Sequence, residues 1–507
     1  MTPEIYKLKY EIKCLKDKCF YTSQENHELK QRVKKYEEKF DEMLSDAVDK
    51  AVALVTEKYN KIIIDLECEI AKLKSQNNTN SSNSSLPPSK NKLNTKITNL
   101  REPSNKPKGG QKGHKRTVLE PFKEEEITEL VDHTLHECTK CSGKLTYLNT
   151  LTSDIIDFDI EIKKTRNNIY KYKCDDCNSI VKANDFLPTG VTYGSSLNAT
   201  AISLLNDSNV PYNKVVKHIS GITDNQINMS EGYVVKLQKK VAKTLIPFEK
   251  ELKETIKKQE ILNTDDTTIT IGQKQGYLRF YGNEKLALII AHATKAKEGF
   301  EEDGILANLT SDVTLVSDHI LYFYNEMFKC KNAECNSHIL RYLKAVNENV
   351  HIHTWNIKLA ELLRRVNKER DNVTHFSDDY IKEIYQTYDE IIKVGYQELE
   401  SLPDYHHYYE KESLLLKRLD KFRDQHLLFI KDWNVPFTNN TAEKSFRISK
   451  TKMKVSGLFQ NIEAAKHYGR ILTYMETCYR NGINKHQAIK RLLDGNPFTV
   501  DELINKS

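Results

Sequence analysis

The amino-acid sequence predicts a multidomain α+β protein. Three observations support this: heptad-spaced apolar residues near the amino terminus, two Cys-x-x-Cys pairs, and a run of strand-like segments followed by helices in the second half. With 507 residues the chain is also too long for one compact core, because a domain usually holds about 100–200 residues. We therefore expect several separately folded parts.

Composition and charge narrow the class of protein. Hydrophobic residues make up 38 % and charged residues 29 %, which is typical of a soluble protein rich in surface helices. The net charge is only +6, so a surface for nucleic acid must depend on where the charges lie. The charged amino terminus lacks a signal-peptide core, and no apolar run approaches the roughly 18 residues of a membrane span. Ten cysteines, four with metal spacing, fit a reducing compartment, so we expect a cytoplasmic protein without a membrane partner.

Residues 1–76 are predicted to form a coiled coil. Apolar side chains follow a 3-4 spacing, and polar Thr22 and Asn26 occupy the same seam, where such residues commonly fix alignment and strand number. The heptads are broken near 47–55, so a helix packed against its own protein is the alternative. Self-association into a homo-oligomer is the favoured interpretation. The apolar seam residues are Ile5, Leu8, Ile12, Leu15, Cys19, Leu29, Val33, Tyr36, Phe40 and Met43, and then Ile63, Leu66, Ile70 and Leu73.

Residues 77–120 are predicted to form a flexible basic linker. Its beginning is rich in Ser, Asn and Thr, a composition that cannot bury enough apolar surface to become ordered. Basic residues then face a single acid, Glu102, between residues 88 and 116, which favours contact with nucleic-acid phosphates over a solvated tail. The candidates for this contact are Lys106, Lys108, Lys112, Lys115 and Arg116.

Residues 121–190 carry a strong metal signal. Cys138 and Cys141 form one Cys-x-x-Cys pair, and Cys174 and Cys177 form a second, with 32 residues between the pairs. Four thiolates complete a closed tetrahedral Zn²⁺ site with a structural role, and redox-active pairs are the alternative. The long gap predicts intervening strands, such as one at 152–163.

Residues 191–258 are predicted to be helical. The apolar spacing indicates short helices broken at Pro211 and Gly221, an arrangement that resembles a helix-turn-helix unit with one helix for a major groove. A plain helical connector fits equally well.

Strands replace helices after residue 258. Three segments read as an antiparallel meander, and a helix near 299–306 leads into a short buried strand. The predicted strands are 260–271, 277–281, 285–293 and 313–317. This β-β-β-α-β order is that of ribonuclease H-like folds, with one acid in the first strand and another at the end of the fourth. Asp265 and Asp318 occupy those two places.

Three acids are the candidate catalytic residues: Asp265, Asp318 and Glu443. The chain holds 71 acids, so the setting of each carries the argument. Two carboxylates at strand ends and a third on a helix can hold two Mg²⁺ ions about 3.5–4 Å apart, with Mn²⁺ as the alternative.

Several motifs together carry a family resemblance. They are residues 83–90, 106–114, the four-cysteine module, 265–267, 335–341 and 439–447, of which the last two are the most specific. On these motifs the chain resembles the bacterial insertion sequence 66 family of DDE transposases over nearly its full length. The resemblance implies Mg²⁺-dependent cleavage and strand transfer by Asp265, Asp318 and Glu443 at transposon-end and target DNA. It also implies small accessory transposition proteins as partners.

Two positions depart from the family pattern. Asp266 replaces the usual Glu after the first Asp, and His319 replaces the usual Gly after the second. Neither change removes a metal ligand. Asp265 and Asp266 must point to opposite faces of a strand, so only one can face the metal, and the family match selects Asp265.

The segment around Glu443 holds further candidates. Asn439 and Asn440 are predicted to cap the helix that presents Glu443. The basic residues beyond Glu443 fit a groove for transposon-end DNA, and a solvated basic face is the alternative. The basic candidates are Lys444, Arg447, Lys452 and Lys454.

Residues 335–435 are predicted to be a helical insertion. It separates the first part of the core, 259–334, from the last part, 436–482, and 483–507 form a tail. Cys335 and His338 can share a helix face, and a supporting role is favoured because metal ligation would need two further ligands. Arg341, one turn on, can reach a phosphate or a carboxylate.

Two other functions are kept as alternatives. One is a catalytically inactive DNA-binding copy that uses only the coiled coil, the basic arm and the zinc module. The other is a ribonuclease H-like nuclease, which cleaves without joining.

Overall fold

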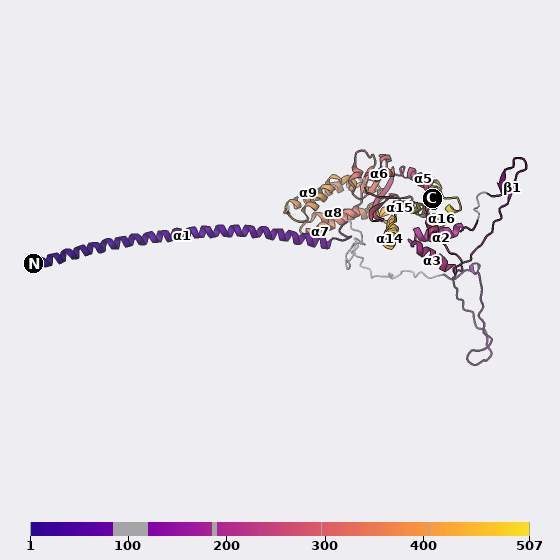
Figure 1. Ribbon diagram of the computed structural model, residues 1–507, viewed down its shortest axis with the longest axis horizontal. Coiled ribbons are helices and arrows are strands. Elements are labelled where there is room, and N and C mark those ends of the chain that lie inside the picture. Colours follow the sequence, from indigo (N-terminus) through magenta and orange to yellow (C-terminus); the bar gives the residue numbers. More distant parts are fainter. Residues whose placement is uncertain (1, 85–119, 185–189, 296, 404, 506–507) are drawn as a thin grey trace. The chain divides into compact units, whose positions relative to one another are not determined.

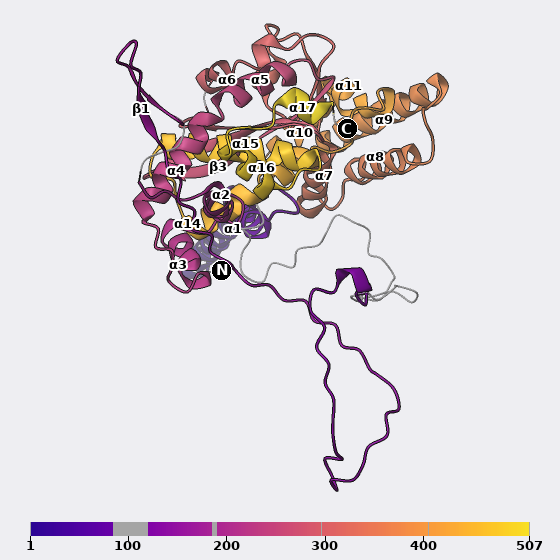
Figure 2. The same ribbon diagram turned by 90° about the vertical axis from the view of Figure 1, so that its right-hand side faces the viewer.

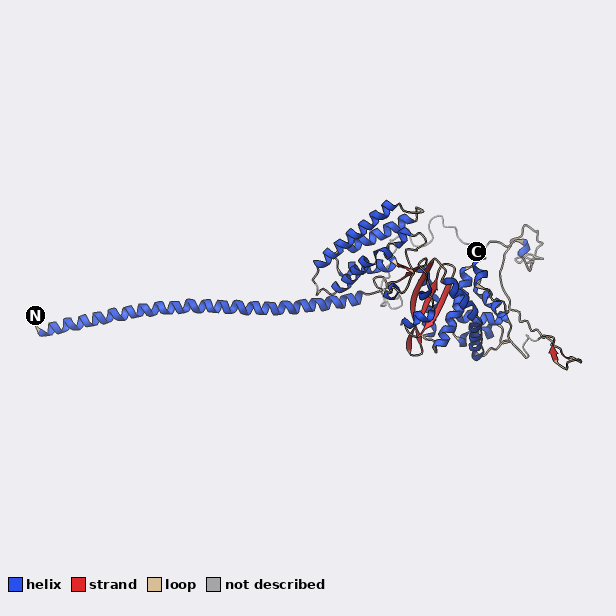
Figure 3. Ribbon diagram, turned by 90° about the horizontal axis from the view of Figure 1, so that it is seen from above, coloured by secondary structure: helices blue, strands red, loops and turns tan. Residues whose placement is uncertain are grey.

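The computed structural model describes residues 2–84, 120–184, 190–295, 297–403 and 405–505. It is a mixed α+β structure, as the sequence predicts, in which helices predominate (Figures 1 and 3). Every helix in these described segments is too short or too polar to cross a membrane.

The chain divides into two compact units. The first combines the described residues of Met1–Thr95 with Arg341–Leu362 and Tyr385–Lys421, and the second holds the described residues of Lys96–Leu340, Leu363–Ile384 and Phe422–Ser507. The five-stranded sheet and all three candidate acids belong to the second unit.

Helix α1 is one uninterrupted helix, Pro3–Asn78. Proline at the first helical position is well placed, because its missing N–H has no partner there in any helix. The single helix confirms the helix predicted for this segment, and it continues through the predicted break in the heptads. The apolar seam side chains are exposed along it, with Leu15 at 62 % and Phe40 at 65 %.

The four-cysteine region holds little regular structure. Strands β1 (Lys171–Lys173) and β2 (Ile180–Lys182) form an antiparallel hairpin around the second cysteine pair. The strand predicted at 152–163 is wrong, since these residues adopt no regular structure. Alternating apolar residues alone do not make a strand, because a strand needs a neighbour to accept its hydrogen bonds.

Four helices follow: α2 (Ser195–Asn206), α3 (Tyr212–Ile222), α4 (Glu231–Thr244) and α5 (Ile246–Ile256). The predicted break at Pro211 is confirmed, because this proline directly precedes α3. Helix α3 ends one residue after Gly221. The Ser230 hydroxyl caps α4 by accepting from the Tyr233 N–H at 3.1 Å.

The central sheet has the strand order β5-β4-β3-β6-β7. Strands β3, β4 and β5 form an antiparallel meander, as predicted, and β6 then pairs parallel with β3. Strand β7 is short and polar, and apolar periodicity did not predict it. The strands are β3 (Ile261–Ile271), β4 (Lys274–Gly282), β5 (Ala287–His292), β6 (Thr314–Ser317) and β7 (Lys331–Glu334).

Helix α15 (Ile462–Arg480) covers the edge strand β5 (Figure 2). Thr473 and Thr477, one turn apart, accept from the backbone N–H groups of Ile289 and Ala287 at 2.8 and 3.3 Å. A side chain at Gly469 would meet the Ile289 carbonyl oxygen at 2.8 Å. The helix therefore lies against the strand and satisfies donors that an edge strand otherwise leaves free.

The other helices surround the sheet or lie in the first unit. The segment 335–435, which the sequence predicts to be helical, contains α7 to α12. The remaining helices are α6 (Lys297–Asp303), α7 (Asn336–Asn349), α8 (Trp355–Arg370), α9 (Asp378–Glu400), α10 (Tyr409–Lys421), α11 (Arg423–His426), α12 (Leu428–Lys431), α13 (Asn440–Ser445), α14 (Arg447–Ser456), α16 (Lys485–Leu493) and α17 (Val500–Ile504).

Candidate active site

Strand β3 points Asp265 and Asp266 to opposite faces of the sheet. In the antiparallel register, Asp265 pairs with Phe280 and Asp266 pairs with Arg279. Directly paired residues share a face, so Asp265 lies on the face of Phe280. Phe280 packs edge-on against Phe446, the residue between α13 and α14, with ring centroids 6.3 Å apart. Asp265 therefore lies on the face that α13 covers.

The Asp266 carboxylate is used on the other face. It accepts from Nε and Nη2 of Arg279 at 2.8 and 3.3 Å, and both side chains are almost completely buried. Arg279 also donates to Asp303 at 2.9 Å and lies over the Phe300 ring. Asp266 is therefore engaged in a buried ion-pair network, whereas Asp265 is on the face of the sheet that α13 contacts.

Asp318 directly follows the end of strand β6 and lies beside Asp265, which is inside the neighbouring strand β3. In the parallel register, Asn263 of β3 pairs with Val316 of β6, and each acid is two residues beyond that pair. Burial, and after it the nearby charge of Asp318, raise the pKa of Asp265 to about 7. Such mutual repulsion is the electrostatic signature of a carboxylate pair that shares one site.

Glu443 comes to this site on the short helix α13. Three contacts tie the helix down: the Thr441 hydroxyl donates to Glu284 at 2.5 Å, Ser445 accepts from Arg480 at 2.7 Å, and Asn439 bonds to β3. Oε1 of Glu443 lies 4.0 Å from Nδ1 of His338.

Asn439 anchors α13 instead of capping it. Its side-chain amide donates to the Thr264 carbonyl at 2.8 Å, and its Oδ1 accepts from the Asn263 amide at 2.9 Å. The predicted side-chain cap is wrong, because α13 has no cap from Asn439, which directly precedes it, and Asn440 is its exposed first residue. The buried Asn439 amide satisfies the backbone carbonyl of Thr264, one residue before Asp265. Leaving this buried carbonyl without a partner would cost more free energy than leaving out a side-chain cap.

Cys335 and His338 join Asp318 in one cluster. The ligand atoms of these three side chains all lie within 4.8 Å of one another. Nδ1 of His338 is 2.7 Å from Oδ1 of Asp318. The Cys335 sulfur accepts from the Asn439 N–H at 3.1 Å, and its own N–H donates to the Ser317 carbonyl at 3.0 Å. The sequence did not show which residues accompany Cys335 and His338, and in the structure Asp318 is one of them.

The His338 imidazole is set up to carry a proton. Burial by itself lowers the pKa of His338, but hydrogen bonds with Asp318 and Cys335 outweigh it and raise the pKa to about 11. A protonated imidazole balances the surrounding carboxylates when no cation does so.

A second buried cluster lies directly behind Asp318, and the sequence did not predict it. Glu334, at the end of β7, accepts from the Tyr324 hydroxyl at 2.6 Å, and its carboxylate lies 2.6 Å from Nδ1 of His319. Nδ1 of His426 lies 3.4 Å from the other Glu334 oxygen. His319, where the family has Gly, therefore binds the strand next to Asp318. The unusual His at position 319 was the one sequence feature that could have pointed to this cluster.

The predicted DNA-contact residues differ in their exposure. Lys444, Arg447 and Lys454 are exposed on α13 and α14, whereas Lys452 is only 7 % exposed and its burial lowers the pKa. The structure therefore does not place Lys452 on the exposed basic surface. Arg341 is half-buried in α7, three residues after His338. The candidates Lys106, Lys108, Lys112, Lys115 and Arg116 lie outside the described residues.

The two cysteine pairs form the same turn. Cys138 donates its N–H to the Gly143 carbonyl at 3.0 Å and accepts from Ser142 at 2.8 Å, and Cys174 does the same with Ser179 and Asn178 at 2.9 Å each. Hydrogen bonds from neighbouring backbone and side-chain groups lower the pKa of Cys138 and of Cys177. Among the described residues, three candidate metal-ligand atoms lie within 4.8 Å of one another only in the cluster of Asp318, Cys335 and His338. The thiols of the two cysteine pairs therefore do not meet in one site in this structure.

Comparison with known proteins identifies the family of this chain. A search of curated proteins finds no match. The sequence model described as the Transposase IS66 family matches residues 190–467, which is more than half of the 507 residues and includes all three acids. The chain therefore belongs to the Transposase IS66 family.

Proposed function

We propose that this transposase nicks the ends of its insertion sequence by hydrolysis and then joins the freed 3′-hydroxyl to target DNA. Asp265, Asp318 and Glu443 hold the two catalytic Mg²⁺ ions in a ribonuclease H-like core. The observation that carries this proposal is the convergence of the three acids: Asp318 raises the pKa of Asp265, and His338 lies between Asp318 and Glu443.

The donor atoms fit Mg²⁺. All three acids offer carboxylate oxygens, the ligands that this ion prefers, with Mn²⁺ as a substitute. Asp318 and Glu443 each keep about a third of their side chains exposed, which leaves room for water and a phosphate oxygen. Mutual repulsion between Asp265 and Asp318 also favours a cation, because a shared positive charge removes it.

The protein's own part in the reaction is to fix oxygen atoms in place. Bound Mg²⁺ would lower the pKa of an attacking water or 3′-hydroxyl and stabilise the leaving oxygen. The paired strands β3 and β6 hold Asp265 and Asp318 side by side, and Asn439 holds the start of the Glu443 helix against β3. In nicking, a water oxygen bonds to phosphorus and the 3′ oxygen leaves as a hydroxyl. In joining, that hydroxyl displaces the 3′ oxygen of the target strand.

The four cysteines support a structural zinc site as part of the same proposal. Two turns with identical hydrogen bonding present two thiols each, with Ser142 and Asn178 in the left-handed conformation at equivalent positions. Lowered pKa values of Cys138 and Cys177 favour the thiolates that zinc requires. Zinc would join the two turns.

Binding of transposon-end and target DNA is assigned to the basic surfaces. Exposed Lys444, Arg447 and Lys454 follow Glu443 directly, and the linker adds its own basic residues. The helices α2–α4 are the candidate helix-turn-helix unit. Self-association is assigned to α1, and the reaction takes place in the cytoplasm with small accessory proteins as further partners.

A cleavage assay separates this proposal from its alternatives. Purified protein is incubated with end-bearing DNA and a target plasmid, with Mg²⁺ or with chelator. The proposal expects metal-dependent nicks at the ends and joined products. An inactive DNA-binding copy shifts the DNA without nicking it, and a nuclease nicks without joining.

A further inference from the structure

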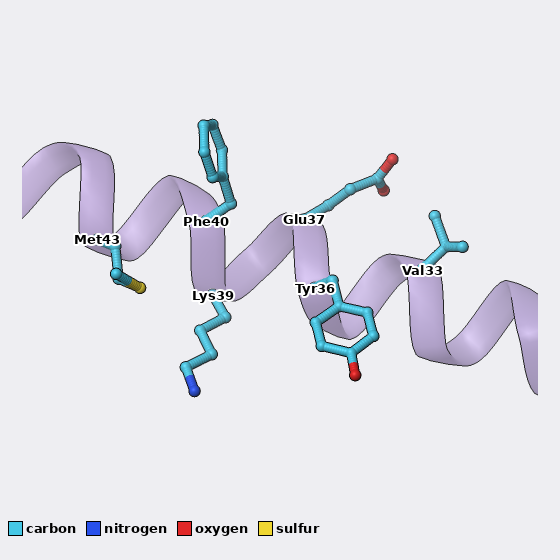
Figure 4. A pocket seen from close by; sticks show the side chains of 6 residues that line it. All are labelled: Val33, Tyr36, Glu37, Lys39, Phe40 and Met43. Atoms are coloured by element: carbon cyan, nitrogen blue, oxygen red, sulfur yellow. The ribbon is translucent and has the colours of Figure 1, made fainter.

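Helix α1 presents an apolar stripe to solvent. Val33, Tyr36, Phe40 and Met43 border an open groove on the helix surface and project outward (Figure 4). Their exposed fractions lie between 52 % and 65 %. An isolated helix gains little from such residues, because most helix stability in proteins comes from packing of an apolar face.

We propose that the occupant of this stripe is α1 of a second copy of the chain, in a parallel, in-register, two-stranded coiled coil. This inference rests on the self-association in the proposed function and adds its orientation, register and strand number. Three independent features of α1 carry it: the charges that flank the seam, the polar seam residues, and the continuity of the stripe.

The flanking charges match a parallel, in-register pair. The first seam position of each seven-residue repeat is called a, and here the a positions begin with Ile5 and Ile12. In a parallel, in-register pair, each residue just before an a position faces the partner residue five places further on. Four of the six such pairs between residues 4 and 44 join opposite charges, and none joins like charges. The opposite pairs are Glu4 with Lys9, Glu11 with Lys16, Glu25 with Lys30, and Arg32 with Glu37.

An antiparallel pair loses this match. Each flank of the seam then faces its own counterpart, and Lys9, Lys16 and Lys30 all belong to one flank. The four opposite pairs above are then not formed, because each of them joins one flank to the other. These four pairs therefore favour the parallel arrangement.

The polar seam residue Asn26 selects the same arrangement. With Ile5 and Ile12 at a positions, Cys19 and Asn26 are a positions too. In a parallel, in-register dimer the two Asn26 amides meet and satisfy each other. A shift by one repeat sets Asn26 against Cys19 or Val33, and in a reversed pair a positions face d positions, so the two amides do not meet. A single buried Asn at an a position also favours two strands over three.

The stripe continues through the break in the heptads. From Phe40 the exposed apolar residues advance in steps of four and then return to a 3-4 spacing, while α1 stays helical throughout. Extra four-residue steps unwind the supercoil locally without ending the contact. The residues are Leu44, Val48, Val52, Val55, Tyr59, Ile63, Leu66, Ile70 and Leu73.

Parallel pairing has a consequence for the reaction. The 76 residues of α1 form a rod about 110 Å long. Both copies of the chain leave that rod at its Asn78 end, so both active sites are tethered to the same end. This suits a reaction in which two element ends are processed together.

A charge exchange in the full-length protein tests the arrangement. Glu25→Lys and Lys30→Glu each place like charges opposite one another in a parallel homodimer, so each should weaken self-association by at least about threefold. A mixture of the two variants restores both pairs and should favour the mixed dimer. The measurement is sedimentation equilibrium of each variant and of the mixture.

A cysteine cross-link provides the matched control. Cys19 faces its own copy across the proposed seam, whereas Cys14 is exposed on the outer side of the same helix. Mild oxidation should link wild-type protein and Cys14→Ser through Cys19, identified by peptide mapping, and should not link Cys19→Ser at Cys14.

The outcomes separate the two levels of the proposal. A monomeric wild-type protein overturns both self-association through α1 and the parallel arrangement. A dimer without Cys19 links, and without preference for the mixed pair, overturns the parallel register alone. Nicking assays on the same samples report on the active site independently.

Discussion

Nδ1 of His338 lies 2.7 Å from Oδ1 of Asp318 and 4.0 Å from Oε1 of Glu443. One imidazole thus touches an acid at the end of β6 and lies near another on α13, although more than a hundred residues separate them in the chain. The charge of Asp318 also raises the pKa of Asp265, so each of the other two candidate acids is linked to Asp318, either by charge or through His338. The proposed chemistry depends on this convergence.

Asp265 and Asp266 should respond in opposite ways to substitution by Asn. Asp265→Asn should abolish nicking while stability stays unchanged or rises, because burial already disfavours the charge of Asp265. Asp266→Asn should lower the free energy of unfolding by about 3 kcal/mol, because the buried Arg279 loses one of its two charged partners and keeps only Asp303. Urea unfolding and nicking assays measure both effects. Loss of nicking in a fully stable Asp266→Asn protein would reverse the assignment.

Asn439 and Asn440 form a second matched pair. Asn439→Ala leaves the Asn263 amide and the Thr264 carbonyl buried without their partner, so it should cost about 2–3 kcal/mol of stability and lower kcat. Asn440→Ala alters an exposed residue and should change stability by less than about 0.5 kcal/mol. Equal effects of the two substitutions on thermal unfolding would mean that a cap, and not the anchor to β3, is what matters.

Zinc should inhibit nicking through Cys335. The sulfur, imidazole and carboxylate around Asp318 form a mixed donor set that suits Zn²⁺ better than Mg²⁺. With the four-cysteine module already loaded, added Zn²⁺ should inhibit Mg²⁺-dependent nicking, and Cys335→Ser should need at least about tenfold more Zn²⁺ for the same inhibition. Cys330→Ser, which alters a buried thiol outside this cluster, is the control. Identical inhibition curves for all three proteins would remove Cys335 from the metal environment.

The basic residues after Glu443 should differ in their effect on DNA binding. Substitution of exposed Lys444 or Arg447 by Gln should lower the salt dependence of end-DNA binding by about one unit of log-log slope for each lost phosphate contact. Lys452→Gln should leave that slope unchanged, because Lys452 is buried. Fluorescence anisotropy at several salt concentrations measures the slopes. A lowered slope in Lys452→Gln alone would place the DNA on a different surface.

Much of the architecture could be predicted from periodicity. The helix of α1, the break at Pro211 and the β3–β4–β5 meander all depend on local spacing, which the sequence displays directly. Strand β7 was missed because Lys331–Glu334 has no apolar alternation, and its pairing with β6 is a tertiary contact. The strand predicted at 152–163 had the alternation but has no neighbouring strand.

The sequence predicted where the candidate acids lie but not the residues that support them. Strand order placed Asp265 and Asp318, the family resemblance chose Asp265 over Asp266, and the register adds that Asp266 shares a face with Arg279. Asn439 was predicted as a cap because local rules favour Asn before a helix, whereas its bonds reach a strand far away in the chain. Such long-range hydrogen bonds leave no periodic pattern in a sequence.

The most direct test of the three-acid site is strand joining by single variants of the full-length protein. Asp265→Asn, Asp318→Asn and Glu443→Gln are assayed with labelled end DNA, a target plasmid and Mg²⁺, and end binding is measured in parallel. The proposal predicts that each variant binds the ends like wild type and that none forms joined product. Joining at a wild-type rate by any one of them would contradict the assignment of that acid to the site.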